Sequence, residues 1–361
     1  MYENRMMPLG RKSSLVFALS AIFPLLHPTS VSLALDPEPQ EPHGKANVIG
    51  EYIAETGFYQ SMRLTEDAPI VSTRSKYQDI TVVESDYYGK ILVLDGVVQL
   101  TEKDADSYNE MMAHIPMMSH NAPSRVLVIG GGDGYVLSEV LKHPMVEHVD
   151  HVDLDEGVIS VCRDYFSWGK AWDDPRVKLH VADGAAFIRD VEAGSYDVII
   201  QDSSDPFTWD DDGAVIDLPS GVLYSQSHFE NLVRVLSPGG ALNLQAETFQ
   251  IPSDLKGIGN WRSNLLDAGF KSAKYGSLAI SSYPTGQIGF MLCKKSPEDN
   301  DRIPTIDDVV RRFGEMVRKG KATSYYQPKL QLSSFDLPLW VENSIYGESI
   351  LSQWSTESDE L

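Results

Sequence analysis

Two aspartates three residues apart are the residues of this chain whose types and spacing best suit a catalytic role. They belong to the run Asp202-Ser203-Ser204-Asp205-Pro206, which follows an apolar, strand-like segment. One carboxylate can accept a proton from an attacking amine while the other holds a distant ammonium group. Because no lysine or arginine occurs between Asp190 and Asn231, this region is strongly electronegative. The pattern favours chemistry on a diamine, although each acid could instead be a turn or helix-capping residue.

A glycine-rich turn between an apolar run at 125–129 and a helix-like segment predicts a nucleoside site. The turn holds Gly130, Gly132 and Gly134, with Asp133 between the last two. Glycines let the backbone turn sharply and approach a ligand closely. A dinucleotide fingerprint needs Gly or Ala where this chain has Tyr135, which disfavours NAD. Asp133 favours a cationic ligand group, an amine or a sulfonium. The same turn could be purely structural.

Strands and helices alternate after residue 125, which predicts an α/β fold with a doubly wound, Rossmann-like, methyltransferase-type, mostly parallel sheet. The expected strands are 125–129, 146–153, 177–181, 196–201, 241–245, 273–279 and 287–292, and the expected helices are 135–142, 156–165, 225–235 and 255–268, with a turn at 237–240. Ligands bind at the carboxyl ends of such strands. Three of these ends carry an acid: Asp153, Asp183 and Asp202. Asp153 lies about 20 residues after the glycines, where a carboxylate receives ribose hydroxyls.

Three segments precede this sheet, and a tail follows it. Residues 1–35 resemble a signal or targeting segment, because basic residues precede an apolar run and small residues follow it, and 36–48 are typical of a linker. Residues 49–118 predict a small N-terminal β-meander domain with strands at 79–85, 90–95 and 97–100, followed by a connecting helix at 104–119. The nucleoside-binding domain is expected over 119–347, with an acidic tail at 348–361.

Composition narrows the range of partners. The 361 residues carry a net charge of −22, which argues against nucleic acid and suits a cationic substrate. The two cysteines, Cys162 and Cys293, fall in apolar stretches and are expected to be core thiols, in a buried helix and a buried strand. No Cys/His spacing predicts zinc. The N-terminal apolar run is too short and too interrupted by proline to span a bilayer.

The chain resembles the spermidine synthases and related polyamine aminopropyltransferases over residues 49–347. The matching motifs are SKYQDI at 75–80, LVLDGV at 92–97, SYNEM at 107–111, the glycine turn with Asp133, Asp183-Gly184, the run from Asp202 to Pro206, and SYPTGQIGF at 282–290. The resemblance implies transfer of the aminopropyl group of decarboxylated S-adenosylmethionine to putrescine, giving spermidine and methylthioadenosine. It implies no metal and no prosthetic group, and a homodimer or higher homo-oligomer. It suggests a cytoplasmic protein, whereas the N-terminal segment suggests secretion or an organelle.

The same resemblance assigns roles to individual residues. Asp202 would accept the proton, and Tyr108, Asp205 and Tyr283 would hold the diamine. The nucleoside substrate would contact Gln78, Gly130, Gly132, Asp133, Gly134 and Asp153, with Asp183 at the adenine edge and Gly184 shaping its turn.

Four features depart from the family pattern. Asp153 stands where spermidine-forming members usually have Glu, and Asn109 stands where many have Gln or His. Phe58 occupies a position expected to hold Trp near the amine pocket, and the loop 207–224 is longer than usual. These departures leave open a spermine- or thermospermine-type synthase. An S-adenosylmethionine-dependent methyltransferase and a catalytically silent, ligand-binding relative are further alternatives.

Overall fold

The computed structural model describes residues 48–53, 55–65, 68–204, 207–209, 215–217, 219–295 and 305–347. The expected targeting segment 1–35, nearly all of the linker 36–48 and the tail 348–361 lie outside the described residues, as do Asp205, Pro206 and 210–214.

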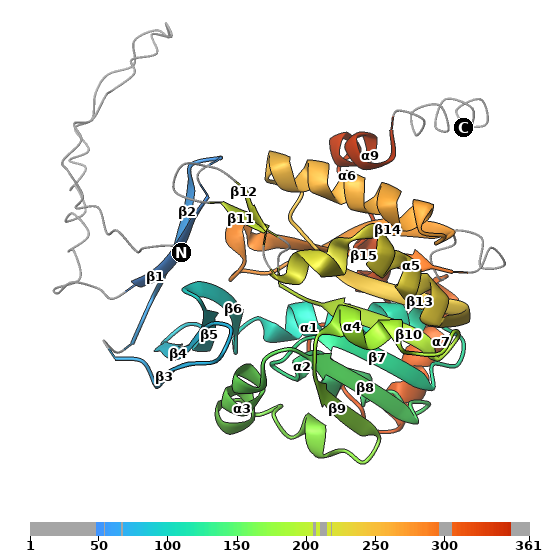
Figure 1. The fold of residues 1–361 in the computed structure, drawn as a ribbon, viewed down its shortest axis with the longest axis horizontal. Coiled ribbons are helices and arrows are strands. Elements are labelled where there is room, and N and C mark those ends of the chain that lie inside the picture. The colour runs from blue at the N-terminus through green and yellow to red at the C-terminus, as the bar shows by residue number, and fades with distance from the viewer. Residues whose placement is uncertain are drawn as a thin grey trace, which may run out of the picture.

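A seven-stranded sheet forms the larger part of the molecule (Figure 1). Its strand order is β14-β15-β13-β10-β7-β8-β9. The five strands from β13 to β9 in this order run parallel, and β15 is antiparallel to both β13 and β14. The strands are β7 (Arg125–Gly130), β8 (His148–Asp153), β9 (Val177–Val181), β10 (Tyr196–Asp202), β13 (Leu236–Ala246), β14 (Ser272–Ala279) and β15 (Gln287–Lys294). The predicted doubly wound, mostly parallel sheet is therefore confirmed.

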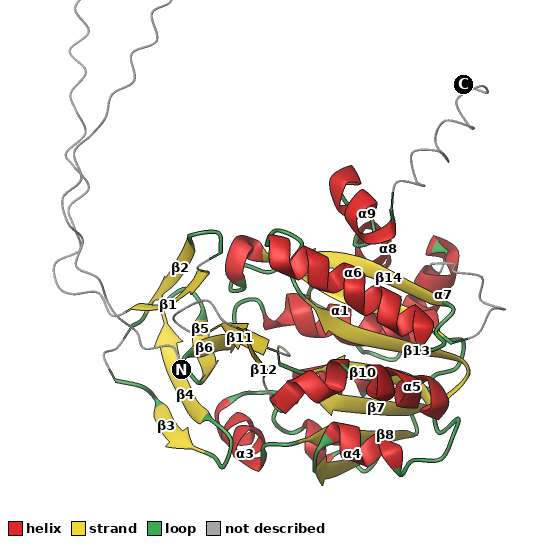
Figure 2. Cartoon of the chain, turned by 45° about the horizontal axis from the view of Figure 1, so that its top comes forward, coloured by secondary structure: helices red, strands yellow, loops and turns green. Residues whose placement is uncertain are grey.

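Alternate residues of β7 enter two separate cores, which explains why the strand is apolar throughout. Val126 and Val128 pack with α1 (Ala105–Ser119), α2 (Tyr135–Val140) and α3 (Glu156–Tyr165). Leu127 and Ile129 pack on the opposite face with helices from the second half of the domain. These are α4 (Gly184–Arg189), α5 (Gln226–Val235), α6 (Pro252–Asp267) and α9 (Leu339–Tyr346). Helices thus cover both faces of the sheet (Figure 2), as a parallel sheet requires.

The N-terminal strands form two small antiparallel sheets at one end of the molecule (Figure 1, blue to teal). One has the order β3-β4-β5-β6, with β3 (Val71–Arg74), β4 (Asp79–Ser85), β5 (Gly89–Leu94) and β6 (Val97–Thr101). The other pairs β1 (Val48–Ile53) with β2 (Phe58–Arg63). The predicted meander at 79–100 is confirmed, whereas β1, β2 and β3 were not predicted because their alternation is mixed with polar and aromatic residues.

Several predicted boundaries were wrong. The expected turn at 237–240 lies within β13, where Gly239 has a φ of 76°. The strand expected from residue 146 begins at His148, and the helix expected at 255–268 is α6, which begins at Pro252 because proline suits the first turn. Three helices after the sheet were not predicted: α7 (Ile306–Arg318), α8 (Pro328–Ser333) and α9.

The predictions for the core residues agree with the structure. Met111, Met112, Ile115, Met117 and Met118 of α1 are all buried, and no thioether is needed as a ligand to explain them. Cys162 on α3 and Cys293 on β15 are both buried free thiols.

Candidate functional site

The sheet brings together three chain segments that are far apart in sequence. β7 lies between β10 and β8, so the ends of these strands form one edge, and Asp202 is the register partner of Gly130. After β7 the chain adds β8 and β9 on one side of it and then crosses to β10 and β13 on the other. The position between β7 and β10 is therefore the switch point where ligands bind in doubly wound sheets. The glycine turn, Asp153 and Asp202 therefore face the same space beyond the strand ends.

The first half of the turn needs glycine because the backbone of β10 lies against it. Gly130 has a φ of 77°, and a Cβ there would come within 2.0 Å of the Asp202 carbonyl oxygen. The next residue uses this closeness, since the N–H of Gly131 donates a 2.7 Å hydrogen bond to that oxygen. A Cβ on Gly132 would lie 2.8 Å from the Asp153 carboxylate. The turn and the two acids are thus packed as one unit.

Three partly buried carboxyl groups meet at this edge, and the charge of Asp202 disfavours the charges of the other two. Burial raises the pKa of Asp133 well above its usual range, and the charges of Asp202 and Asp153 raise it further. Burial also raises the pKa of Asp153 to about 6 and that of Asp202 to about 6. Within the part of the chain that the structure describes, no lysine or arginine acts on these three groups. A cationic ligand would supply the missing charge.

Tyr108 on α1 reaches the acid at the end of β10. Its hydroxyl donates a 2.6 Å hydrogen bond to Oδ1 of Asp202, which favours the charged carboxylate and lowers the pKa of Asp202 against the effect of burial. The pKa of Tyr108 itself is raised well above its usual range, by burial and then by Asp202. Tyr108 is therefore a neutral donor that stabilises the ionised form of Asp202.

Gln78 contacts Asp155, an acid that was not predicted to belong to the site. Its Nε2 donates a 2.9 Å hydrogen bond to Oδ2 of Asp155, which also accepts a 2.6 Å bond from Ser75. The other oxygen of Asp155 caps α3 by accepting from the Gly157 N–H. Asp155 thus ties the loop of Gln78 to the helix after β8. Its position at a strand end, before a helix, was the available sequence signal.

Asp183 is exposed, and its carboxylate caps α4 by accepting from the Ala186 N–H at 3.0 Å. Gly184 follows, where a Cβ would come within 2.6 Å of the Ile129 side chain. Asp183 stands one strand further from Asp202 than Asp153 does, beyond the end of β9.

Tyr283 meets an acid that follows the fifth parallel strand. Its hydroxyl donates a hydrogen bond to Oε2 of Glu247, which lies just beyond β13 and is buried. Tyr275 fixes the same residue by donating a 2.7 Å hydrogen bond to the Glu247 carbonyl. Since β13 is the parallel neighbour of β10, Glu247 belongs to the same sheet edge as Asp202. Sequence reasoning missed it because the strand was expected to end at Gln245.

Asp104 links the two segments that carry Tyr108 and Tyr283. Although it precedes α1, its side chain does not cap that helix. Its carboxylate instead accepts 2.7 Å bonds from the Ser281 hydroxyl and the Ser282 N–H, and a 2.9 Å bond from the Ser282 hydroxyl. Only the folded chain reveals this contact, since Asp104 and Ser282 are 178 positions apart.

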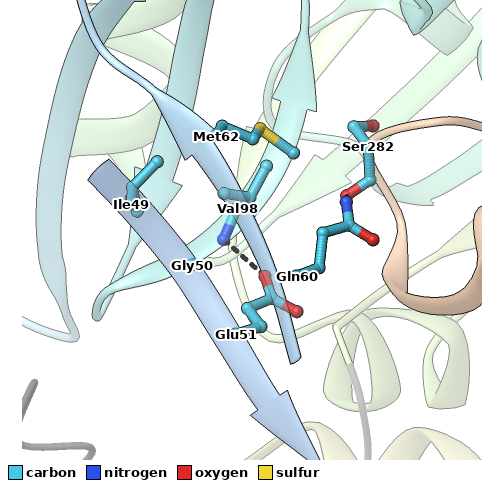
Figure 3. Close-up of a pocket in the computed structure, with 7 residues that line it drawn as sticks. All are labelled: Ile49, Gly50, Glu51, Gln60, Met62, Val98 and Ser282. Carbon is cyan, nitrogen blue, oxygen red and sulfur yellow. Dashed lines mark hydrogen bonds between the residues drawn. The ribbon is translucent and has the colours of Figure 1, made fainter. Parts of the chain in front are cut away.

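The β1–β2 hairpin holds the same turn from the other side (Figure 3). Nε2 of Gln60 donates a 3.0 Å hydrogen bond to the Ser282 carbonyl, and Glu51 accepts a 3.0 Å bond from the Val98 N–H. The cavity between them has a volume of about 10 Å³, room for roughly one water molecule. The turn before Tyr283 is therefore anchored to both N-terminal sheets.

The remaining contacts concern Tyr224 and the family departures. Tyr224 is buried and donates a 3.1 Å hydrogen bond to Oε1 of Gln245, and its proximity contributes to the raised pKa of Tyr108. Asn109 is buried and donates a 2.9 Å bond to the Ala105 carbonyl of its own helix. Phe58 is partly buried in β2.

The described residues hold neither a metal cluster nor a membrane span. Among them, no three His, Cys, Asp or Glu side chains are grouped so that they could hold a metal ion. Over the same part of the chain, no helix has the length and apolar character needed to cross a bilayer.

Comparisons with known proteins agree with this arrangement. Residues 105–302 match the spermine/spermidine synthase domain, and residues 54–102 match the spermidine synthase tetramerisation domain. The chain is 38% identical to spermidine synthase 2 of Datura stramonium over 276 residues, which are 75% of this chain and 82% of the relative. It is 39% identical to a spermine synthase of Arabidopsis thaliana over 273 residues, 75% of this chain and 72% of that one.

Two solved structures that resemble this protein are also spermidine synthases. A crystal structure of a spermidine synthase in complex with the transition-state analogue AdoDATO is similar with a TM-score of 0.71 and 29% identity, over 86% of this chain and 98% of that chain. The spermidine synthase of Thermotoga maritima is similar with a TM-score of 0.70 and 28% identity, over 86% and 97% of the two chains. With its sheet edge, its acids and these matches, the chain belongs to the spermine/spermidine synthase family.

Proposed function

We propose that this protein is an aminopropyltransferase that moves the aminopropyl group of decarboxylated S-adenosylmethionine onto putrescine, giving spermidine and methylthioadenosine. The observation that carries the proposal is the group of three partly buried carboxyl groups with raised pKa values, Asp133, Asp153 and Asp202, at one sheet edge. Both substrates are cations, so their charges would offset the desolvation and mutual repulsion of these acids. An intact S-adenosylmethionine carries a carboxylate that Asp133 would repel, which disfavours methyl transfer from that compound.

The reaction is a direct displacement. The lone pair of one amine nitrogen attacks the methylene carbon next to the sulfonium, the carbon–sulfur bond breaks, and its electrons leave the sulfur neutral as a thioether. The attacking nitrogen then loses a proton, which Asp202 accepts. Asp202 suits this role because burial raises its pKa, which makes its carboxylate a better proton acceptor, while the hydrogen bond from Tyr108 stabilises its ionised form. The protein supplies alignment and a water-poor site.

We assign the other contacts on the same basis. Asp133 would face the cationic part of the nucleoside substrate, Asp153 its ribose hydroxyls and Asp183 its adenine edge, with Gln78 supporting the site through Asp155. The glycines at 130, 132, 134 and 184 would allow close approach of that substrate. Tyr108 and Tyr283 would hold the diamine together with Asp205, which lies outside the described residues. Tyr283 is hydrogen-bonded to Glu247, which adds a further acid to the site.

A spermine-type synthase is the second candidate, favoured by the 39% identity to the Arabidopsis thaliana spermine synthase. The two reactions share the chemistry and differ in the acceptor, spermidine instead of putrescine. We propose that the long loop expected at 207–224 affects the length of the acceptor amine.

The test is an assay of purified protein with decarboxylated S-adenosylmethionine and, side by side, putrescine, spermidine and cadaverine. Methylthioadenosine should form fastest with putrescine, with spermidine as the second product. Intact S-adenosylmethionine serves as the control and should give no transfer. Faster turnover with spermidine would make the protein a spermine-type synthase, and absence of methylthioadenosine with every amine would refute aminopropyl transfer.

The match to a tetramerisation domain indicates a homo-oligomer, and we propose that the β1–β2 hairpin takes part in its contacts. Tyr52 and Tyr59 are direct cross-strand partners on this two-stranded sheet. Both side chains are more than half exposed, at 54% and 59%. Exposed aromatic side chains on a strand pair with free edges are typical of an interface between protein chains.

A further inference from the structure

One peptide group of the glycine turn is held from both sides. The carbonyl of Gly130 accepts a 2.7 Å hydrogen bond from Nε2 of His151. The N–H of the same peptide group belongs to Gly131 and donates a 2.7 Å hydrogen bond to the Asp202 carbonyl. His151 lies on β8 and Asp202 ends β10, so the two flanking strands both hold the turn that follows β7.

Such a peptide group needs to be held because glycine stands on both sides of it. Gly130 has a φ of 77° and Gly131 a φ of 64°. Without Cβ atoms, residues like these visit both signs of φ at little cost, so the peptide plane between them has few local barriers to reorientation. Its orientation is therefore set by hydrogen bonds from other parts of the fold.

The fold also determines which ring nitrogen of His151 carries the proton. The indole Nε1 of Trp172 lies 2.7 Å from Nδ1 of His151. An indole N–H only donates and a carbonyl oxygen only accepts, so Nδ1 must be the acceptor and Nε2 must carry the hydrogen. The imidazole is therefore neutral with one defined tautomer. Complete burial agrees with this, because it lowers the pKa of His151 to about 4.

Trp172 contacts the turn a second time, directly. A Cβ on Gly134 would come within 2.6 Å of the indole, so its six-membered ring lies against the last glycine of the turn. The indole and imidazole planes are nearly parallel, at 16° with centroids 5.9 Å apart, which suits the hydrogen bond between their edges. Trp172 belongs to the short helix Ala171–Asp173, and both it and His151 are buried.

We propose that His151 and Trp172 are positioning residues for the nucleoside site. The chain of donors runs from the Trp172 indole to His151, through the 130–131 peptide group, to the backbone of Asp202. It holds the glycine turn in the orientation that the nucleoside substrate meets, and it holds the backbone that carries Asp202. This role rests on the proposed aminopropyl transfer for its substrate, but the hydrogen-bonded chain exists without any ligand.

The variants follow from the donor and acceptor pattern. His151→Leu removes both bonds of the imidazole, whereas His151→Gln retains one acceptor and one donor on a side chain that does not titrate. Trp172→Phe keeps an aromatic side chain but removes the indole donor and the outer ring atoms that contact Gly134. His143→Leu is the matched control, because His143 is a buried histidine with a 2.8 Å hydrogen bond to His114, on the far side of α2 from the turn.

Calorimetry with methylthioadenosine tests the proposal independently of turnover. We expect His151→Leu to weaken binding roughly 10- to 100-fold, since small misplacements of a binding element cost about this much. Trp172→Phe should show a smaller loss, and His151→Gln should recover most of the affinity. The control should lower the melting temperature and leave the affinity unchanged. A folded His151→Leu that binds like the wild type, or a Gln variant as weak as Leu, would overturn the proposal.

A second measurement tests the proposal even if His151→Leu does not fold. Nitrogen-15 NMR of labelled wild-type protein should show one histidine locked as the Nε2–H tautomer at neutral pH, absent from His151→Gln and altered in Trp172→Phe. An Nδ1–H tautomer or an imidazolium at this position contradicts the proposal. Wild-type protein that shows this signal but makes no methylthioadenosine from its substrates would refute the proposed function and leave the positioning role intact.

Discussion

The hydroxyl of Tyr108 donates a 2.6 Å hydrogen bond to Oδ1 of Asp202, and this single contact joins helix α1 to the end of β10. Tyr108 comes from the segment that links the small sheets to the large one, so the contact ties the placement of the acid to the packing of the two parts. It also lowers the pKa of a carboxyl group that burial raises.

Replacing Asp202 with Asn should separate binding from turnover. The amide retains an acceptor for Tyr108 but cannot take a proton, and loss of a general base costs roughly 10²–10⁴-fold in rate. We expect kcat to fall by that factor while calorimetry shows methylthioadenosine still bound. Tyr108→Phe is the companion variant and should lose less, since the base remains. Near-normal turnover of Asp202→Asn would show that another group takes the proton.

The stability of the ligand-free protein should fall as the pH rises through about 6. The pKa of Asp153 is raised to about 6 when folded, against an ordinary value of 3.8, so the folded protein holds this proton more tightly than the unfolded chain. The stability from this group is complete below pH ~4 and is lost above about 6. Asp153→Asn should therefore raise the melting temperature at pH 8, by an amount equivalent to ~3 kcal/mol, and have a smaller effect near pH 4.5. A lower melting temperature for the variant at pH 8 would contradict this account.

Asp104→Ala should damage use of the amine more than binding of the nucleoside. Its carboxylate holds the 281–282 turn next to Tyr283, on the side of the site that we assign to the diamine. We expect the KM for putrescine to rise about tenfold or more and the affinity for methylthioadenosine to stay within about twofold, since misplacing a binding group costs of this order. Asp86→Ala removes an exposed carboxylate bonded to Thr65 and serves as the control. Equal losses for both substrates would point to general destabilisation instead.

The pair Tyr52→Ser and Tyr59→Ser should shift the protein to a smaller assembly. These exposed cross-strand partners are the aromatic surface that we assign to contacts between copies. Light scattering after size exclusion measures the mass directly, and circular dichroism should show unchanged folding. Trp340→Ser is the matched control, because Trp340 is also exposed, at 53%, but lies on α9, outside the stretch matched to the tetramerisation domain. An unchanged mass for the double variant would place the contacts elsewhere.

A chain that begins near Asp36 should fold and remain active. The proposed division assigns 1–35 to targeting and 36–48 to a linker, and the first described strand begins at Val48. None of the residues assigned to the site lies before Gln78. The melting temperature and the putrescine assay of the shortened protein should match those of the full chain. A large loss of stability would show that the removed segment packs against the rest.

Local patterns in the sequence were sufficient to predict the sheet and much of its edge. The apolar run before Gly130 and the alternation that follows predict parallel strands, because these properties depend on neighbours along the chain. A parallel strand also directs its last residue to a known edge, so the sequence alone places Asp153 and Asp202 there. The motifs around the glycine turn were specific enough to indicate the family.

Tertiary structure alone decided which side chains meet. Glu247 became the partner of Tyr283 because β13 extends further than its pattern indicated, and Asp104 reached Ser282 across 178 positions. In the sequence, His151 is simply one residue of a buried strand. In the folded protein, the Trp172 indole donates to one of its ring nitrogens, and the other donates to the Gly130 carbonyl. Such contacts depend on how distant segments pack, and periodicity carries no information about the partner of a polar side chain.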